Sequence, residues 1–75
     1  MKTNIRLKIA KKIKELRRKR GYTQERLSEL SDIDYKYLQR IEGKRPPNIK
    51  IETIEKLAKA FKISVSKLLE DKHAK

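Results

Sequence analysis

The chain has 75 residues, a formal net charge of +12 from 22 lysines and arginines against ten acids, and no cysteine. A chain of this length forms one domain and buries only about 60% of its unfolded surface, which argues against a large internal substrate cavity. The lack of cysteine excludes disulfides and thiolate metal sites, and a single histidine, His73, makes an all-protein zinc site hard to build, so no metal and no cofactor is expected.

The pattern of apolar residues predicts a cytoplasmic protein. No apolar run approaches the roughly 20 residues needed to span a bilayer, and the first six residues lack the apolar core and cleavage site of a signal peptide. The positive charge is concentrated in residues 1–20, which hold ten bases and one acid. Such a field attracts polyanions, of which nucleic acid is the commonest inside cells. A solvated Lys/Glu-rich surface of the thermophile kind is the alternative explanation.

The first predicted element is a helix of roughly residues 4–20. Its apolar stripe consists of residues at spacings of four, four and three: Ile5, Ile9, Ile13 and Leu16. Gly21 follows at the point where a glycine can take the left-handed conformation that ends a helix. The cationic last turn also suits the helix dipole.

A second helix is predicted from its cap, Thr23, to about Ser31. Glu25 lies in its first turn, and Leu27 and Leu30 form its apolar face. The next three residues, 32–34, are typical of a tight turn.

The third predicted helix runs from about Tyr35 to Glu42, with Asp34 as its cap. Leu38 and Ile41 point inward, and Tyr37 lies near the border between the two sides. The residues on the remaining faces are Tyr35, Lys36, Gln39 and Arg40.

Gly43 is expected to end the third helix, and residues 44–48 to form an extended loop, because each of the two prolines at 46–47 disfavours helix in the residue before it. A fourth helix is predicted from about 51 to 61, with apolar residues at Ile51, Ile54, Leu57, Ala58 and Phe61. Ser64 can cap a short last helix that carries Val65, Leu68 and Leu69.

No convincing strand appears in the sequence. The sequence predicts one all-α domain, 1–75, with an ordered core of about residues 4–70 and a frayed tail over 71–75.

The second and third helices suit a reader of duplex DNA. The major groove is about 12 Å wide and accepts one helix, while the preceding helix braces it across the backbone. Arginine and lysine suit guanine O6 and N7, glutamine suits adenine N6 and N7, and a tyrosine ring can pack on a thymine methyl. These residue types lie on the outer side of the third helix, so double-stranded DNA is the expected partner.

Three segments of the chain resemble the phage repressor/Cro-type helix-turn-helix family, also called the XRE family. Residues 21–30 (GYTQERLSEL) resemble its helix-2 signature, residues 37–44 (YLQRIEGK) its helix-3 ending, and residues 54–64 (IEKLAKAFKIS) its fourth helix. The resemblance covers roughly residues 5–70. It implies a five-helix lambda-repressor-like fold with the helix-turn-helix in helices 2 and 3, and DNA binding as the function.

The resemblance also implies which residues contact DNA. Gln24 stands where the family has a glutamine that hydrogen-bonds a phosphate and steadies the first residue of the recognition helix. The positions that most often meet base edges are Tyr35, Lys36, Tyr37 and Arg40, with Gln39 nearer the helix flank, and Lys44 and Arg45 match the loop that grips phosphates. The alternatives are that the tyrosines pack against the body of the protein and that the cations are simply solvated. The bases of residues 17–20 are either a solvated helix end or phosphate contacts.

The chain departs from the family pattern in three places. Asp32 stands where the family often has a glycine, and Asp34 replaces the usual serine or threonine cap. Residues 42–44 lack the residue usually found between the glutamate and the glycine, and one residue is added before the fourth helix. These departures leave the phosphate contacts of residues 43–50 open.

An enzyme is not expected, because the sequence offers no placed histidine, no glycine-rich phosphate loop and no framed pair of carboxylates. Glu42 is interpreted as a structural hydrogen-bonding residue or the partner of an arginine. The favoured function is a transcriptional regulator, a repressor, that acts as a homodimer on a near-palindromic operator. Its dimer surface is expected on the last helix, at Val65, Leu68 and Leu69; the alternative is that these three residues complete the core of a single chain. The alternative is an antitoxin-type protein that binds a toxin as well as its own operator. RNA and membrane-surface binding are disfavoured, because the first helix lacks bulky aromatic anchors and no stacking platform is evident.

Overall fold

The computed structural model describes residues 4–70, and within that range it contains helices and no strand. In chain order the helices are α1 (Ile5–Lys19), α2 (Gln24–Ser31), α3 (Tyr35–Ile41), α4 (Ile51–Phe61) and α5 (Val65–Leu69). The all-α, five-helix prediction is confirmed, and the first four helices begin and end within one residue of their predicted bounds. The tail over 71–75, with His73, lies outside the described residues.

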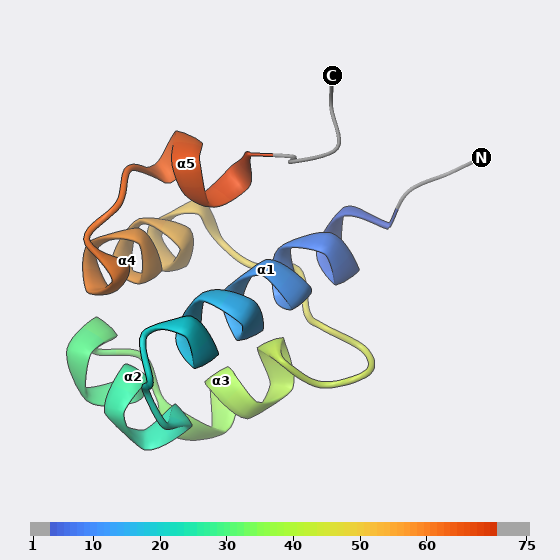
Figure 1. Cartoon of the computed structure of the whole chain (residues 1–75). Coiled ribbons are helices and arrows are strands. Elements are labelled where there is room, and N and C mark those ends of the chain that lie inside the picture. The colour runs from blue at the N-terminus through green and yellow to red at the C-terminus, as the bar shows by residue number, and fades with distance from the viewer. Residues whose placement is uncertain (1–3, 71–75) are drawn as a thin grey trace.

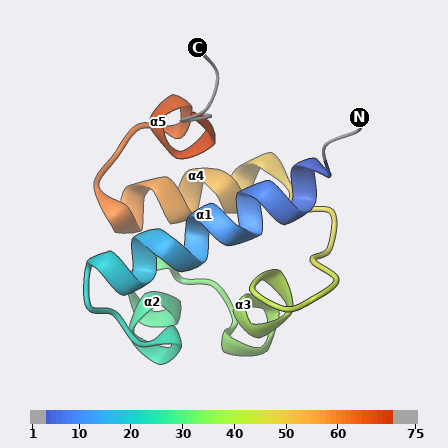
Figure 2. The ribbon, with the colours of Figure 1, turned by 45° about the vertical axis from the view of Figure 1, so that its right-hand side comes forward.

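The helices pack around α1 and α4. Helix α1 crosses the middle of the molecule, with α2 and α3 on one side of it and α5 on the other (Figure 1). Turning the molecule by 45° keeps this order and shows α4 lying behind α1 (Figure 2). Helix α2 packs against both α3 and α4, and α1 packs against α4 and α5. The pair α2–α3 is therefore carried on a platform formed by α1 and α4.

Side-chain caps explain where most helices begin. The side chains of Thr23, Asp34 and Ser64 accept hydrogen bonds from first-turn backbone N–H groups of α2, α3 and α5, as the sequence predicts. Asn4 does the same for α1. Helix α4 begins after Lys50 without a side-chain cap, so its position rests on packing.

The hydrophobic core draws on every helix. Its fully buried large side chains are Ile13, Leu27, Leu38, Ile41, Leu57, Phe61 and Leu68. The ring of Phe61 stacks on that of Tyr22, with 6.3 Å between their centroids. Removal of this apolar surface from water is the main force that holds the short helices together.

Three residues predicted on buried stripes are exposed instead. Ile5 is 63% exposed, Ile51 62% and Leu30 40%. Ile5 and Ile51 are the first residues of α1 and α4. Helical periodicity defines a face of a helix but not how far along that face another helix covers it.

The short last helix mostly completes the core of its own chain. Leu68 is 1% exposed, and Val65 is half-buried against the core cluster. Leu69 is 42% exposed. Leu68 therefore belongs to the core of its own chain, as the alternative to a dimer surface has it, and Leu69 is left exposed.

Residues in the left-handed conformation follow α1, α2 and α4. Gly21 has φ +72°, as the sequence predicts, and Asp32 and Lys62 have φ +59° and +61°. Asp32 thus takes the conformation for which the resembling family often uses glycine. Helix α3 ends differently, because Gly43 does not have a positive φ; its N–H donates to the carbonyl oxygen of Arg40 at 3.1 Å.

Candidate nucleic-acid interface

The turn between α2 and α3 is fixed by one serine and one isoleucine. The Ser28 hydroxyl donates to the carbonyl oxygen of Ile33 at 2.6 Å, and the Ile33 N–H donates to the carbonyl oxygen of Ser28 at 3.3 Å. The Ile33 side chain is buried in the core. These contacts hold α3 at a set angle to α2, which a helix entering a groove requires.

Helix α3 is buried on one side and polar on the other. Leu38 and Ile41 are fully buried, whereas Lys36, Gln39 and Arg40 are exposed. The buried pair anchors the helix to the body of the protein. The exposed residues supply hydrogen-bond donors that fit the base edges of the major groove.

The two tyrosines of α3 occupy different environments. Tyr37 is half-buried and packs against the core cluster. Tyr35 is half-buried at the start of the helix, and its hydroxyl oxygen accepts a hydrogen bond from Gln39 Nε2 at 3.2 Å. Gln39, predicted nearer the helix flank, is exposed. For Tyr37 the structure shows the border position that the sequence predicts, with packing against the core.

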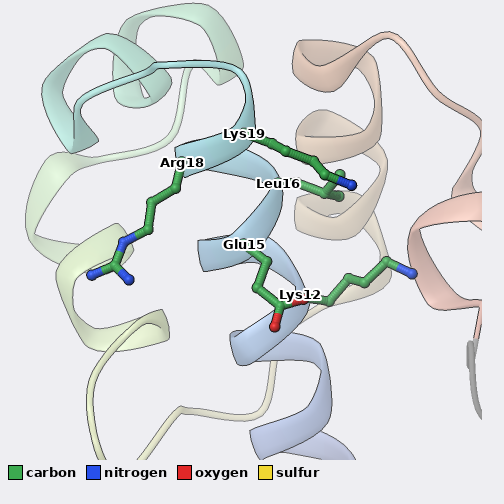
Figure 3. Close-up of a pocket in the computed structure, with 5 residues that line it drawn as sticks. All are labelled: Lys12, Glu15, Leu16, Arg18 and Lys19. Carbon is green, nitrogen blue, oxygen red and sulfur yellow. The ribbon is translucent and has the colours of Figure 1, made fainter.

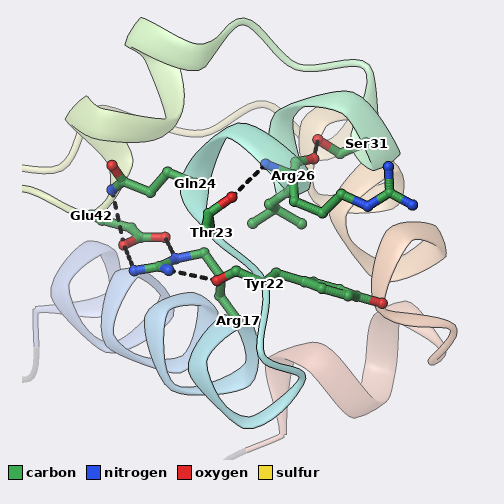
Figure 4. A network of polar contacts seen from close by, with 8 residues as sticks. Arg17, Tyr22, Thr23, Gln24, Arg26, Ser31 and Glu42 are labelled. Atoms are coloured by element: carbon green, nitrogen blue, oxygen red, sulfur yellow. Dashed lines mark hydrogen bonds and ion pairs between the residues drawn. The ribbon is translucent and has the colours of Figure 1, made fainter.

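A partly buried ion pair ties α1 to the end of α3 (Figure 4). Arg17 Nε lies 2.8 Å from Glu42 Oε2 and Arg17 Nη2 lies 3.0 Å from Glu42 Oε1, a two-point contact. Arg17 Nη1 also donates to the carbonyl oxygen of Tyr22 at 2.8 Å. The side chains of Arg17 and Glu42 are 13% and 3% exposed. The prediction that Glu42 is a structural partner of an arginine is confirmed.

Gln24 joins the same network. Its Nε2 donates to Glu42 Oε1 at 3.1 Å, so the start of α2 is linked to the end of α3 (Figure 4). A primary amide has a second N–H, which leaves Gln24 able to donate to a phosphate while Glu42 holds it. The hydrogen bond from Arg17 to Glu42 raises the pKa of Arg17 above its ordinary value; burial acts in the opposite direction, and attraction to the carboxylate adds to the rise.

Arg17 is the structural residue that the sequence analysis missed. It belongs to the basic run of residues 17–20, yet it faces inward, while Arg18, Lys19 and Arg20 are exposed. The signal was its position four residues after Ile13, on the buried face of α1. A base at such a position needs a carboxylate partner, because an unpaired buried charge is costly.

The loop after α3 presents two cations. Lys44 and Arg45 are exposed, and Pro46, next in the chain, is buried. The loop is therefore anchored to the body of the protein while its cations face solvent. This arrangement suits contact with a phosphate backbone.

A surface hollow on α1 extends the positive field (Figure 3). It is lined by Lys12, Glu15, Leu16, Arg18 and Lys19. Arg18 extends toward the side of α3, and Lys19 toward the side of α4 (Figure 3). Arg18 is thus the exposed base of this hollow that lies nearest the α3 side of the molecule.

Neither a metal centre nor a membrane segment is found in the part of the chain that the structure describes. Over residues 4–70, no group of histidine, cysteine, aspartate and glutamate is suited to hold a metal ion. No helix in the same range is both long and apolar enough to cross a bilayer.

The chain matches a helix-turn-helix family model and is similar to a transcriptional regulator. The family model described as Helix-turn-helix matches residues 13–68. Over 65 residues the chain is 34% identical to the HTH-type transcriptional regulator SinR of Bacillus subtilis (strain 168). The aligned residues make up 87% of this chain and 59% of SinR. A solved structure of a SinR protein/SinI protein complex matches with a TM-score of 0.78 and 34% identity, over 87% of this chain and 63% of the solved one. The chain thus spans less than two thirds of the length of either relative.

Proposed function

The chain belongs to the phage repressor/Cro-type (XRE) helix-turn-helix family, and from that premise we propose that it is a cytoplasmic repressor that binds double-stranded DNA sequence-specifically. The observation that carries the proposal is helix α3. Its side chains Leu38 and Ile41 are fully buried on one side, and exposed side chains with hydrogen-bond donors lie on the other side. A helix held in this way fits the major groove and reads base edges there.

The roles of the side chains follow from their positions. Lys36, Gln39 and Arg40 are proposed to contact bases, with Tyr35 and Tyr37 at the edges of the interface. Gln24, Lys44 and Arg45 are proposed to contact phosphates. Phosphate contacts fix the register of the protein on the duplex, and base contacts supply the sequence preference.

The DNA-bound form is proposed to be a homodimer on a near-palindromic operator. One domain of this size reads only a few base pairs, and two copies on a two-fold axis double the contacts. Leu69 is the exposed apolar residue of α5 and is available to such a contact.

Selection of bound sites from random duplex DNA tests the proposal. We expect a recovered site with two related half-sites, and loss of enrichment for a Lys36→Ala/Arg40→Ala variant that melts at the wild-type temperature. Recovery of no preferred sequence by the wild-type chain would contradict the proposal.

A second candidate function adds a protein partner to the same DNA-binding domain. It is favoured by the solved relative, which is a SinR protein/SinI protein complex. An antitoxin-type protein, which binds a toxin and its own operator, is one form of this candidate. Co-expression with the product of the adjacent gene tests it: a complex of the two that elutes together supports the candidate, and separate elution contradicts it.

A further inference from the structure

Tyr35 and Gln39 form a hydrogen-bonded pair on the outer side of α3. The two residues are four apart, so their side chains lie on the same side of the helix. Gln39 Nε2 donates to the Tyr35 hydroxyl oxygen at 3.2 Å. We infer that Gln39 reads an adenine in the major groove and that Tyr35 is a positioning residue that holds the Gln39 amide for this contact; the inference rests on the proposed function.

The hydrogen-bonding groups that remain on Gln39 match adenine. A glutamine amide has two N–H donors and one carbonyl acceptor. The bond to Tyr35 uses one N–H, which leaves one N–H and the Oε1 acceptor. Adenine presents an acceptor, N7, beside a donor, N6, at its major-groove edge. The free half of the Gln39 amide therefore complements adenine at two points.

The tyrosine hydroxyl limits the orientations of the amide before DNA arrives. A free glutamine side chain loses rotamer freedom when a partner immobilises it, and this loss weakens binding. Gln39 is exposed, so the core does not restrict its rotamers, and Tyr35 is half-buried at the start of the helix. The less mobile ring thus restrains the more mobile amide.

The neighbouring residues of α3 do not offer the same chemistry. Lys36 and Arg40 carry donors only, which suits the two acceptors of guanine. Tyr37 packs against the core. On the exposed face of α3, Gln39 is thus the side chain that combines a donor and an acceptor in one planar group.

The test measures the base preference of the wild-type chain and of five variants. The preferred site is first selected from random duplex DNA with the wild-type chain, and duplexes with each base pair of a half-site replaced are then titrated. Gln39→Ala is expected to lower the preference for adenine over the other bases at one position by about 5- to 150-fold. Gln39→Glu is expected to change the preferred base there from adenine to cytosine, whose N4 amino group donates to a carboxylate.

The positioning role is tested by Tyr35→Phe, which removes only the hydroxyl. This variant is expected to lower the same adenine preference several-fold in the wild-type background and to leave it unchanged in the Gln39→Ala background, because the two residues act as one unit. Lys44→Ala is the matched control: it should weaken binding equally on all duplexes.

The outcomes separate this inference from the proposed function. A wild-type chain without sequence preference would contradict the proposed function itself. A wild-type preference that survives Gln39→Ala at every position overturns the reading role of Gln39. A Tyr35→Phe effect of equal size in both backgrounds overturns the positioning role, since it would then come from a separate contact of Tyr35.

Discussion

Arg17 and Glu42 illustrate how a single pair can join three elements. Their contact spans 25 residues of sequence and holds the end of α3 to α1, and Gln24 adds the start of α2. The exposed fractions of 13% and 3% mean that water screens the pair only weakly. The ion pair therefore holds the end of α3 in position against α1.

The first prediction concerns the loss of this pair. Glu42→Ala should lower the free energy of unfolding by about 1–3 kcal/mol, because the partly buried Arg17 guanidinium loses the carboxylate to which it donates. Urea denaturation followed by circular dichroism measures the effect. The control is Arg17→Met/Glu42→Met, which removes both charges and should cost less than the single change. A single variant as stable as the wild type would show that Arg17 turns to solvent when unpaired.

A second prediction at the residue scale concerns Arg40, which is exposed on α3. Arg40→Ala should cost roughly 1–3 kcal/mol of binding free energy on the preferred site and relax the preference at one base pair. Titration of the preferred duplex and its single-base variants measures both effects. An equal loss on every duplex would mean that Arg40 contacts a phosphate instead of a base.

At the scale of elements, α3 depends on its buried side. Leu38 is fully buried, and α2 is the helix that packs against α3. Leu38→Ala should lower the free energy of unfolding by roughly 2–5 kcal/mol, because the lost side chain leaves a cavity. Thermal or urea unfolding checks this. Gln39→Ala on the exposed side of the same helix is the control, and equal stability of the two variants would mean that α3 is not anchored through Leu38.

At the end of α4, a substitution is expected to raise the free energy of unfolding instead of lowering it. Lys62 has φ +61°, a left-handed conformation that costs a side-chain-bearing residue roughly 1–2 kcal/mol and costs glycine little. Lys62→Gly should therefore raise stability by about 0.5–1 kcal/mol after the greater chain entropy of unfolded glycine is counted. Lys62→Ala, which keeps the Cβ and removes the charge, is the control. A glycine variant no more stable than the alanine variant would show that the left-handed residue is not strained.

At the scale of the whole molecule, positive charge on several elements acts together. The chain carries a net charge of +12, and the exposed bases include the loop after α3 and the end of α1. Lys44, Arg45 and two of the exposed bases at 18–20 give about four neutralised phosphates per subunit, and about eight per dimer. Counterion release then predicts a slope near −7 for log K against log salt concentration.

Footprinting combined with the salt titration tests the dimer. The footprint should show two half-sites roughly 10 base pairs apart, centre to centre, which is one turn of the duplex. Binding measured from low to high salt gives the slope. A single asymmetric half-site with a slope shallower than about −3 would contradict the dimer and leave a monomeric binder.

Local sequence features determined the helices and most of their ends. Thr23, Asp34 and Ser64 cap the helices that follow them, and Gly21 takes the left-handed conformation expected after α1. Apolar spacing correctly predicted that Ile13, Leu27, Leu38 and Leu57 are buried. These features were predictable because capping and helical periodicity act over one or two turns of chain.

Only the tertiary structure decided which side chains are covered and which remain available to DNA. Ile5 and Ile51, the first residues of α1 and α4, are exposed although they continue the apolar stripes of those helices. Arg17 turns inward because Glu42, distant in sequence, lies beside it. Gln39 is exposed and held by Tyr35, whereas Tyr37 packs against the core. Each of these outcomes depends on how far one element extends over another, which a periodic pattern within a single helix does not contain.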